Sequence, residues 1–145
     1  MTVIETDSGE ERSVTFLSED QVRDLVALAE EARQELSLFS GREVDFNVGA
    51  VQLLDEWVED YLQTRPDPSV QVRLLWTSLL GEMFRRHHNG WWVLRGGKLV
   101  IVCPSEAGDW RLVAVREQID RRIEHGMSES LTYFYNVTRI ELKLG

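Results

Sequence analysis

The chain of 145 residues is 43% hydrophobic, contains five tryptophans and carries a net charge of −9, which indicates one folded domain and excludes global disorder. Its longest apolar runs are five residues, as in Leu99 to Cys103, far fewer than the ~18 that a membrane helix needs, and the first residues do not resemble a signal peptide. A single cysteine excludes an internal disulfide and is typical of a reducing compartment, so we expect a soluble cytoplasmic protein.

Residues 1–12 are polar, acidic and without periodicity, so we expect a flexible acidic tail ahead of a single α+β domain that spans residues 13–145. The segment from Ser13 to Leu17 is a candidate for a short extended stretch. A capping box at Ser18 and the helical spacing of the apolar residues after it then predict a first helix from about Glu19 to Leu38.

Two more helices follow. Asn47 is a suitable cap for the second, which must end at Pro66 because residues before proline are pushed out of the helical region. Its acidic side chains lie off its apolar stripe and are expected on a solvated face: Asp55, Glu56, Glu59 and Asp60. The third helix begins at Pro68 or Ser69 and has the widest apolar face, so we expect it to be central. A glycine in its interior, Gly81, costs roughly 1 kcal/mol relative to alanine and indicates a close approach by another backbone.

The sequence then predicts a β-hairpin. Gly96-Gly97 is a strong signal for a two-residue turn between strands at Trp91 to Arg95 and Lys98 to Cys103. This turn fixes the register, so that Trp91 faces Val102. One face then holds Trp92, Leu94, Leu99, Ile101 and Cys103, and the other holds Trp91, Val93, Val100 and Val102. Helices can cover the first face, whereas the second needs the C-terminal segment or a second subunit.

A third strand, Trp110 to Val115, would complete an antiparallel meander. A short helix from Glu117 to His125 follows, and its outward side is expected to carry Arg116, Arg121 and Arg122.

The end of the chain is ambiguous. Ser128 is a candidate cap for a last helix through about Asn136, and residues 137–144 alternate like a strand, which we favour there, although helix is also compatible. The order of elements predicts an α+β fold with three N-terminal helices packed on a small antiparallel β-meander, the hairpin 91–103 plus a third strand, and a C-terminal helical segment.

The charge is divided unevenly along the chain. Residues 1–66 carry 16 acidic and 5 basic side chains, whereas residues 67–145 carry 9 acidic and 11 basic ones. The acidic half would repel phosphates, so we expect neither nucleic acid nor a membrane as a partner. A basic protein partner would suit it. The alternatives are attraction between the two halves or an acidic face that serves solubility alone.

The densest cationic cluster lies at the end of the third helix. We interpret it as a candidate ligand or partner patch, which comprises Glu82, Arg85, Arg86, His87, His88 and Trp91. Arginines beside a tryptophan can bind an anion or an acidic protein through charge-assisted hydrogen bonds. Ion pairs within the helix would explain Glu82 equally well, and contacts with the acidic helices would explain the cations.

No catalytic, cofactor-binding or metal-binding motif is recognisable, so our leading hypothesis is a non-enzymatic binding module, inhibitor-like or immunity-like, for a basic protein. One alternative is a small hydrolase or metal-dependent enzyme built on Glu82, His88 and His125, although His87 and His88 point about 100° apart on a helix and would chelate one metal poorly. Another is a homodimer that pairs through the second hairpin face. Cys103 is expected to be a buried packing residue rather than a nucleophile.

The residues Leu79-Leu80-Gly81-Glu82, followed by a basic run and then Gly90-Trp91-Trp92-Val93, resemble a pattern of small bacterial families known only as domains of unknown function. In these families an L-G-E helix precedes a G-x-W hairpin. The resemblance extends to Arg122-Ile123-Glu124-His125-Gly126 and covers about residues 68–136, but Arg116 stands where the pattern has a proline. It implies a unit of helix, hairpin and helix, and it implies no activity.

Overall fold

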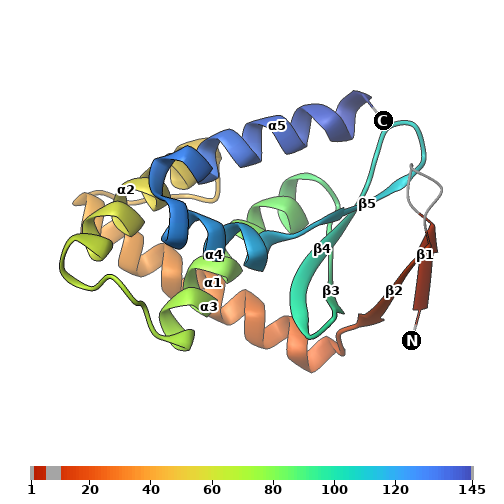
Figure 1. Ribbon diagram of the computed structural model, residues 1–145, viewed down its shortest axis with the longest axis horizontal. Coiled ribbons are helices and arrows are strands. Elements are labelled where there is room, and N and C mark those ends of the chain that lie inside the picture. Colours follow the sequence, from red (N-terminus) through yellow and green to blue (C-terminus); the bar gives the residue numbers. More distant parts are fainter. Residues whose placement is uncertain (1, 6–10, 145) are drawn as a thin grey trace.

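The computed structural model describes residues 2–5 and 11–144, with side chains from residue 13 onwards. Its helices are α1 (Glu19–Ser40), α2 (Val48–Thr64), α3 (Val70–His87), α4 (Val115–His125) and α5 (Leu131–Leu144), and a 3₁₀ turn, η1 (Gly126–Glu129), joins the last two. Its strands are β1 (Thr2–Glu5), β2 (Glu11–Phe16), β3 (Trp91–Arg95), β4 (Lys98–Pro104) and β5 (Trp110–Val113). The predicted α+β fold is confirmed, and α2 and β1 mark the two ends of the long axis (Figure 1).

The strands form an antiparallel sheet in the order β1-β2-β3-β4-β5. The hairpin register is as predicted, from Trp91 opposite Val102 to Arg95 opposite Lys98. β1 and the start of β2 fall in the segment 1–12, where we expected no regular structure; instead, β1 pairs with β2. Residues 1 and 6–10 of that expected tail lie outside the described residues.

Both faces of the hairpin are largely buried, as its two-sided apolar pattern predicts, although Trp91 on the outer face is exposed. Trp92, Ile101 and Cys103 belong to the main core between sheet and helices. On the outer face, Val93 and the valines of β4 cluster with Val14 of β2. We expected the C-terminal segment or a second subunit to cover this outer face. Instead, its valines are already buried within the chain, in a cluster with Val14, and α5 packs its buried residues into the main core.

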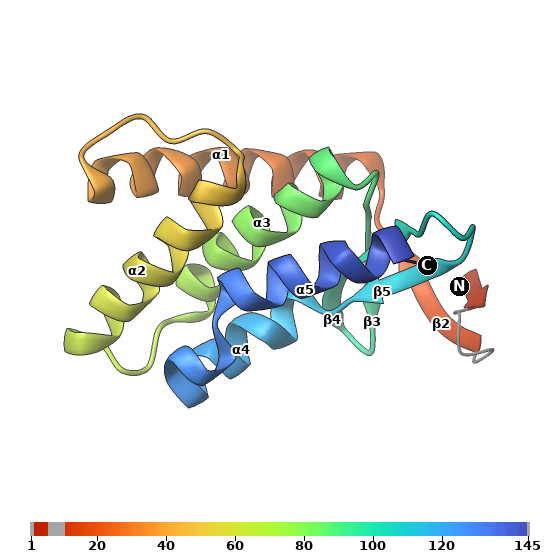
Figure 2. The same ribbon diagram turned by 90° about the horizontal axis from the view of Figure 1, so that it is seen from above.

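α3 is the central helix, as its apolar face predicts. Ten consecutive residues, Leu75 to Phe84, are buried, and α3 lies between α1 on one side and α4 and α5 on the other (Figure 2). A Cβ atom at Gly81 would overlap the six-membered ring of Trp92. The close approach predicted for this glycine is therefore real, but the approaching group is a side chain of β3 rather than a backbone.

Three expectations for the last third of the chain are wrong. Residues 137–144 are helical because Leu131, Tyr135 and Leu142 share one face of α5 and bury it against the core. Ser128 lies in η1, and the hydroxyl that caps α5 belongs to Ser130. Arg122 points inward and is fully buried, because it meets acidic partners on α2.

Within the part of the chain that the structure describes, no helix has both the length and the apolar character that crossing a membrane requires.

Candidate functional site

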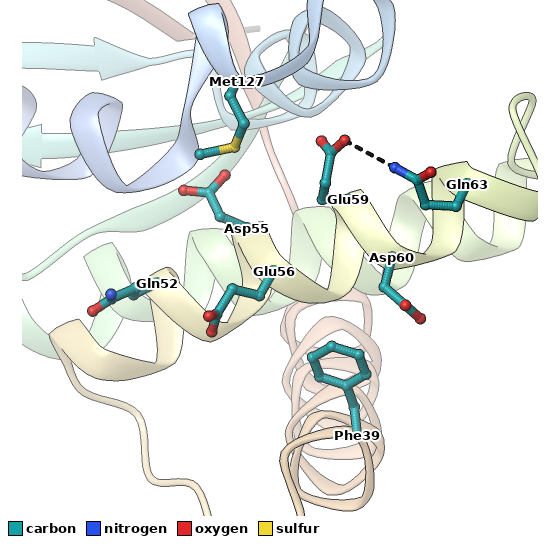
Figure 3. Close-up of a pocket in the computed structure, with 8 residues that line it drawn as sticks. All are labelled: Phe39, Gln52, Asp55, Glu56, Glu59, Asp60, Gln63 and Met127. Carbon is teal, nitrogen blue, oxygen red and sulfur yellow. Dashed lines mark hydrogen bonds between the residues drawn. The ribbon is translucent and has the colours of Figure 1, made fainter.

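A cavity of about 570 Å³ lies on the outer side of α2, between the end of α1 and η1. We call it the acidic pocket; it is lined by Phe39, Gln52, Asp55, Glu56, Glu59, Asp60, Gln63 and Met127 (Figure 3). The four carboxylates form two rows with i, i+4 spacing on α2. In Figure 3, Asp55 and Glu59 turn towards Met127, whereas Glu56 and Asp60 turn towards Phe39.

Asp55 forms the floor of the acidic pocket and is almost fully buried. Its Oδ1 accepts hydrogen bonds from the Leu131 amide (2.9 Å) and from Nε of Arg122 (3.0 Å). Its Oδ2 accepts from the Thr132 amide (2.8 Å), the Thr132 hydroxyl (2.7 Å) and the Ser130 hydroxyl (3.0 Å). Leu131 and Thr132 carry the first amides of α5, which have no acceptor within their own helix. Asp55 therefore caps α5 from across the molecule.

Arg122 completes this floor. Its Nη2 donates to Glu59 at 2.9 Å, and its Nε holds Asp55. Burial by itself raises the pKa of Asp55, but the hydrogen bonds from Thr132, Leu131 and Arg122 outweigh it, so that the pKa lies below its ordinary value. The carboxylate is thus charged at neutral pH and is fully committed to holding α2, α4 and α5 together.

Two of the other carboxylates are available to a ligand. Glu56 and Asp60 are exposed and form no ion pair with any described residue. With Asp55, Glu59 and the single guanidinium of Arg122, they leave a net charge of −3 at neutral pH. The two ends of the pocket are apolar, because Phe39 lies at one end and Met127 at the other. Both side chains can be reached from solvent, since Phe39 is 39% and Met127 55% exposed. This arrangement is suited to a cationic group on an aliphatic stem.

The predicted patch at the end of α3 does not form one site. Glu82 is fully buried; its Oε1 pairs with Nε of Arg85 and lies 3.5 Å from Nε of Arg86, as the ion-pair alternative predicts. Arg86 then stacks on the Phe46 ring at 4.0 Å. His87 contacts the same residue, with Nε2 2.6 Å from the Phe46 carbonyl oxygen. Arg86 and His87 thus hold the loop between α1 and α2 against the end of α3.

His88 and Trp91 diverge from that group. Nε2 of His88 lies 3.3 Å from the Tyr135 hydroxyl of α5. Burial, and then the positive charges of His87, Arg139 and Lys143, lower the pKa of His88. Trp91 instead lines a second cavity of about 320 Å³, which we call the tryptophan pocket; it is lined by Val22, Arg85, Asn89, Gly90, Trp91 and Trp92.

The residues of the enzyme alternative also lie apart. Glu82 is buried in its ion pairs and His88 faces α5, whereas His125 is exposed at the end of α4, 3.9 Å from Glu124. Among the described residues no group of three or more His, Cys, Asp or Glu side chains is placed to hold a metal ion. Burial raises the pKa of Cys103 to about 12, which keeps its thiol protonated, as expected of a packing residue.

The comparisons with known proteins give no family. No protein-family model matches the chain, and neither a curated protein nor a solved structure matches it. The resemblance to small bacterial families therefore stays a prediction.

Sequence reasoning missed the Asp55–Arg122 pair, although one signal for it was present. Arg122 follows Val115 and Ile119 at helical spacing, so it falls on the buried stripe of α4. A charged residue in such a stripe requires a buried partner. What the sequence could not show was that the partner is Asp55, 67 residues earlier.

Proposed function

We propose that this protein is a non-enzymatic cytoplasmic binding module, inhibitor-like or immunity-like, whose acidic pocket receives a lysine or arginine side chain of a basic protein partner. The observation that carries the proposal is the net charge of −3 at a cavity with apolar ends. Opposite charge at such a surface gives a partner both orientation and a faster encounter.

The chemistry of a long cationic side chain matches the pocket from end to end. Its aliphatic stem would pack against Met127 and its charged head would meet Glu56 and Asp60. A guanidinium in this position would also lie near the face of Phe39, where a cation–π contact adds attraction. Asp55 would not move, because its hydrogen bonds hold it.

The surroundings of the pocket support the same class of partner. Residues 1–66, which include α1 and α2, carry 16 acidic side chains against 5 basic ones. Their field extends about 8 Å at physiological ionic strength. Binding of a basic partner should therefore weaken as salt is added, and a purely apolar contact would not behave in this way.

Affinity capture from a lysate of the source cells, at low and high salt, tests the proposal. We expect a basic protein to be retained at low salt and released at high salt. The double variant Glu56→Gln/Asp60→Asn should bind that protein about tenfold more weakly, since each exposed charge pair contributes up to about 1 kcal/mol.

The matched control is Asp24→Asn/Glu31→Gln, which removes the same charge from exposed positions on α1 outside the pocket. It should keep most of the binding. Retention of no protein at either salt concentration would overturn the proposal, and so would equal loss of binding in the two double variants, because only general charge would then matter.

A further inference from the structure

The tryptophan pocket lies where three elements meet. Val22 comes from the first turns of α1, Arg85 from the last turn of α3, and Trp91 and Trp92 from the start of β3. Val22 and Phe39 are 17 positions apart on α1, which places the tryptophan pocket roughly 25 Å from the acidic pocket. The two cavities are therefore separate sites.

Trp91 is the exposed wall of this pocket. It is 56% exposed, whereas its neighbour Trp92 is buried in the core. Trp91 meets Phe16 of β2 edge to face, with ring centroids 6.5 Å apart, and Phe16 is itself 41% exposed. An aromatic surface thus continues from the pocket onto the outer face of the sheet. Exposed tryptophans of this kind are enriched at binding hot spots.

Arg85 supplies the charge of the pocket, and it is held in place from below. Its Nε pairs with the buried carboxylate of Glu82. Its two terminal nitrogens form no hydrogen bond with any residue that the structure describes, and the side chain is 35% exposed. A guanidinium fixed in this way can still offer its outer edge to a carboxylate, which it binds with paired hydrogen bonds.

The charge balance selects the kind of anion. Arg85 is the one charged residue that lines the tryptophan pocket, and Arg86, which shares the carboxylate of Glu82, offsets the charge of that carboxylate, so the pocket presents a net charge of +1. That value matches a single carboxylate. A nucleic acid would bring a row of phosphates to a chain whose net charge is −9. The electrostatic repulsion would then exceed the attraction that one guanidinium provides.

We propose that the tryptophan pocket binds an aspartate or glutamate side chain of an acidic partner segment, with an apolar residue of that segment packed on Trp91 and Phe16. The carboxylate pairs with the outer edge of Arg85, and the aromatic surface gives the segment its direction. This proposal does not depend on the acidic pocket, because a different surface and the opposite charge carry it.

The test uses fluorescence polarisation with labelled, capped hexapeptides whose central Asp or Glu is flanked by apolar residues. Each peptide is paired with a counterpart that has Asn or Gln at the centre. We expect the best acidic peptides to bind the wild-type protein about tenfold more tightly than their amide counterparts, as a charge-assisted hydrogen bond in a partly buried site provides. Absence of any preference for the acid across the set would overturn the proposal.

Two variants locate the binding. In Glu82→Gln/Arg85→Gln the buried carboxylate and the guanidinium that lines the pocket are removed together, and the remaining partner of Glu82, Arg86, keeps its charge on a side chain that is 41% exposed. The preference for the acid should fall to within about twofold. Trp91→Ala, at an exposed position, should weaken acidic and amide peptides alike. Arg95→Gln, a cation at the hairpin tip outside the tryptophan pocket, is the matched control and should change neither. Circular dichroism confirms that each variant is folded.

Two further outcomes would count against an acidic segment. A short single-stranded DNA that binds more tightly than every peptide, and loses binding in Glu82→Gln/Arg85→Gln, would identify a nucleic acid as the ligand. A dimer that light scattering detects in the wild type and not in Trp91→Ala would show that a second copy occupies the surface.

Discussion

Each pocket is supported by a buried carboxylate that pairs with an arginine: Asp55 lines the acidic pocket itself, and Glu82 holds Arg85, which lines the tryptophan pocket. The two carboxylates differ in how many partners they have. Asp55 receives five hydrogen bonds from described residues on α4 and α5 and at their junction. Glu82 uses one oxygen for two arginines of its own helix, and its Oε2 has no hydrogen-bond partner in the described structure. The first carboxylate holds three helices together, and the second mainly holds the side chain of Arg85 in place.

The difference shows that burial alone does not identify a functional acid. Asp55 satisfies groups that have no other acceptor, namely the first amides of α5, and its loss would leave several donors unpaired. Glu82 serves only side chains that reach water, since those of Arg85 and Arg86 are 35% and 41% exposed. The number and origin of the donors decide which role a buried carboxylate has.

The largest effect is expected from Asp55→Asn. An amide nitrogen in place of one oxygen would face donors from Thr132 or Leu131, and Arg122 would lose the buried one of its two carboxylate partners and keep only Glu59. Removing one member of a buried pair costs about 3–5 kcal/mol, and we expect a loss of that size in the free energy of unfolding, measured by urea denaturation. Glu56→Gln, on the exposed rim of the same pocket, is the control and should change it by less than about 0.5 kcal/mol.

A loss below about 1 kcal/mol for Asp55→Asn would contradict the difference drawn between the two carboxylates, because Asp55 would then contribute no more to the stability of the fold than Glu82.

A smaller effect is expected at the wall of the tryptophan pocket. Gly81→Ala places a methyl group within the ring of Trp92, and overpacking of this kind costs about 1–3 kcal/mol. Thermal unfolding followed by circular dichroism measures the loss. Alanine is otherwise the better helix former by about 1 kcal/mol, so a variant more stable than the wild type would show that Trp92 moves aside freely and that this wall is not rigid.

Glu82→Gln sharpens the comparison directly, because it makes the same chemical change as Asp55→Asn. Glutamine keeps an oxygen for Arg85 and places its amide nitrogen where Oε2 has no partner in the described structure. We expect a loss of about 1 kcal/mol or less in the free energy of unfolding, in line with a partly exposed ion pair. A loss equal to that of Asp55→Asn would mean that Glu82 and Asp55 have the same structural role.

The smallest effect is expected in the pH dependence of the free energy of unfolding. It distinguishes two contacts of α5, that of Asp55 with its first amides and that of His88 with Tyr135. Both groups have a lowered pKa in the folded state, so each contributes stability above its unfolded pKa that is lost as the pH falls towards the folded value. The loss from His88 should begin below about pH 6.5 and that from Asp55 below about pH 3.8. In His88→Gln, urea unfolding at pH 7 and pH 5.5 should show a smaller difference than in the wild type. An unchanged difference would contradict this assignment.

Much of the fold follows from short-range signals. The caps at Ser18, Asn47 and Ser69 set the starts of three helices, and Gly96-Gly97 fixes the hairpin register because a two-residue turn allows only one pairing. These predictions hold because neighbouring residues determine the outcome.

The predictions that failed were ones that depended on distant residues. The helix over residues 137–144 forms because the core accepts its apolar face, and local alternation could not show this. The acidic pocket was expected only as an acidic surface, since its floor depends on Arg122 from α4. The patch at the end of α3 was predicted as one site because its members are close in sequence. Instead, they point in three directions, towards the α1–α2 loop, towards α5 and into the tryptophan pocket.

The capping of α5 by Asp55 has a consequence for the order in which the protein folds. The first amides of this helix find their acceptor 76 and 77 positions away in the chain, so α5 gains that stabilisation only after α2 and α4 have docked. Contacts over such separations form late, because loop-closure entropy opposes them until the rest of the core exists. During synthesis α5 is also the last of the described helices to emerge. The final step of folding should therefore be the docking of α5, which buries its own Tyr135 and Leu142 in the main core.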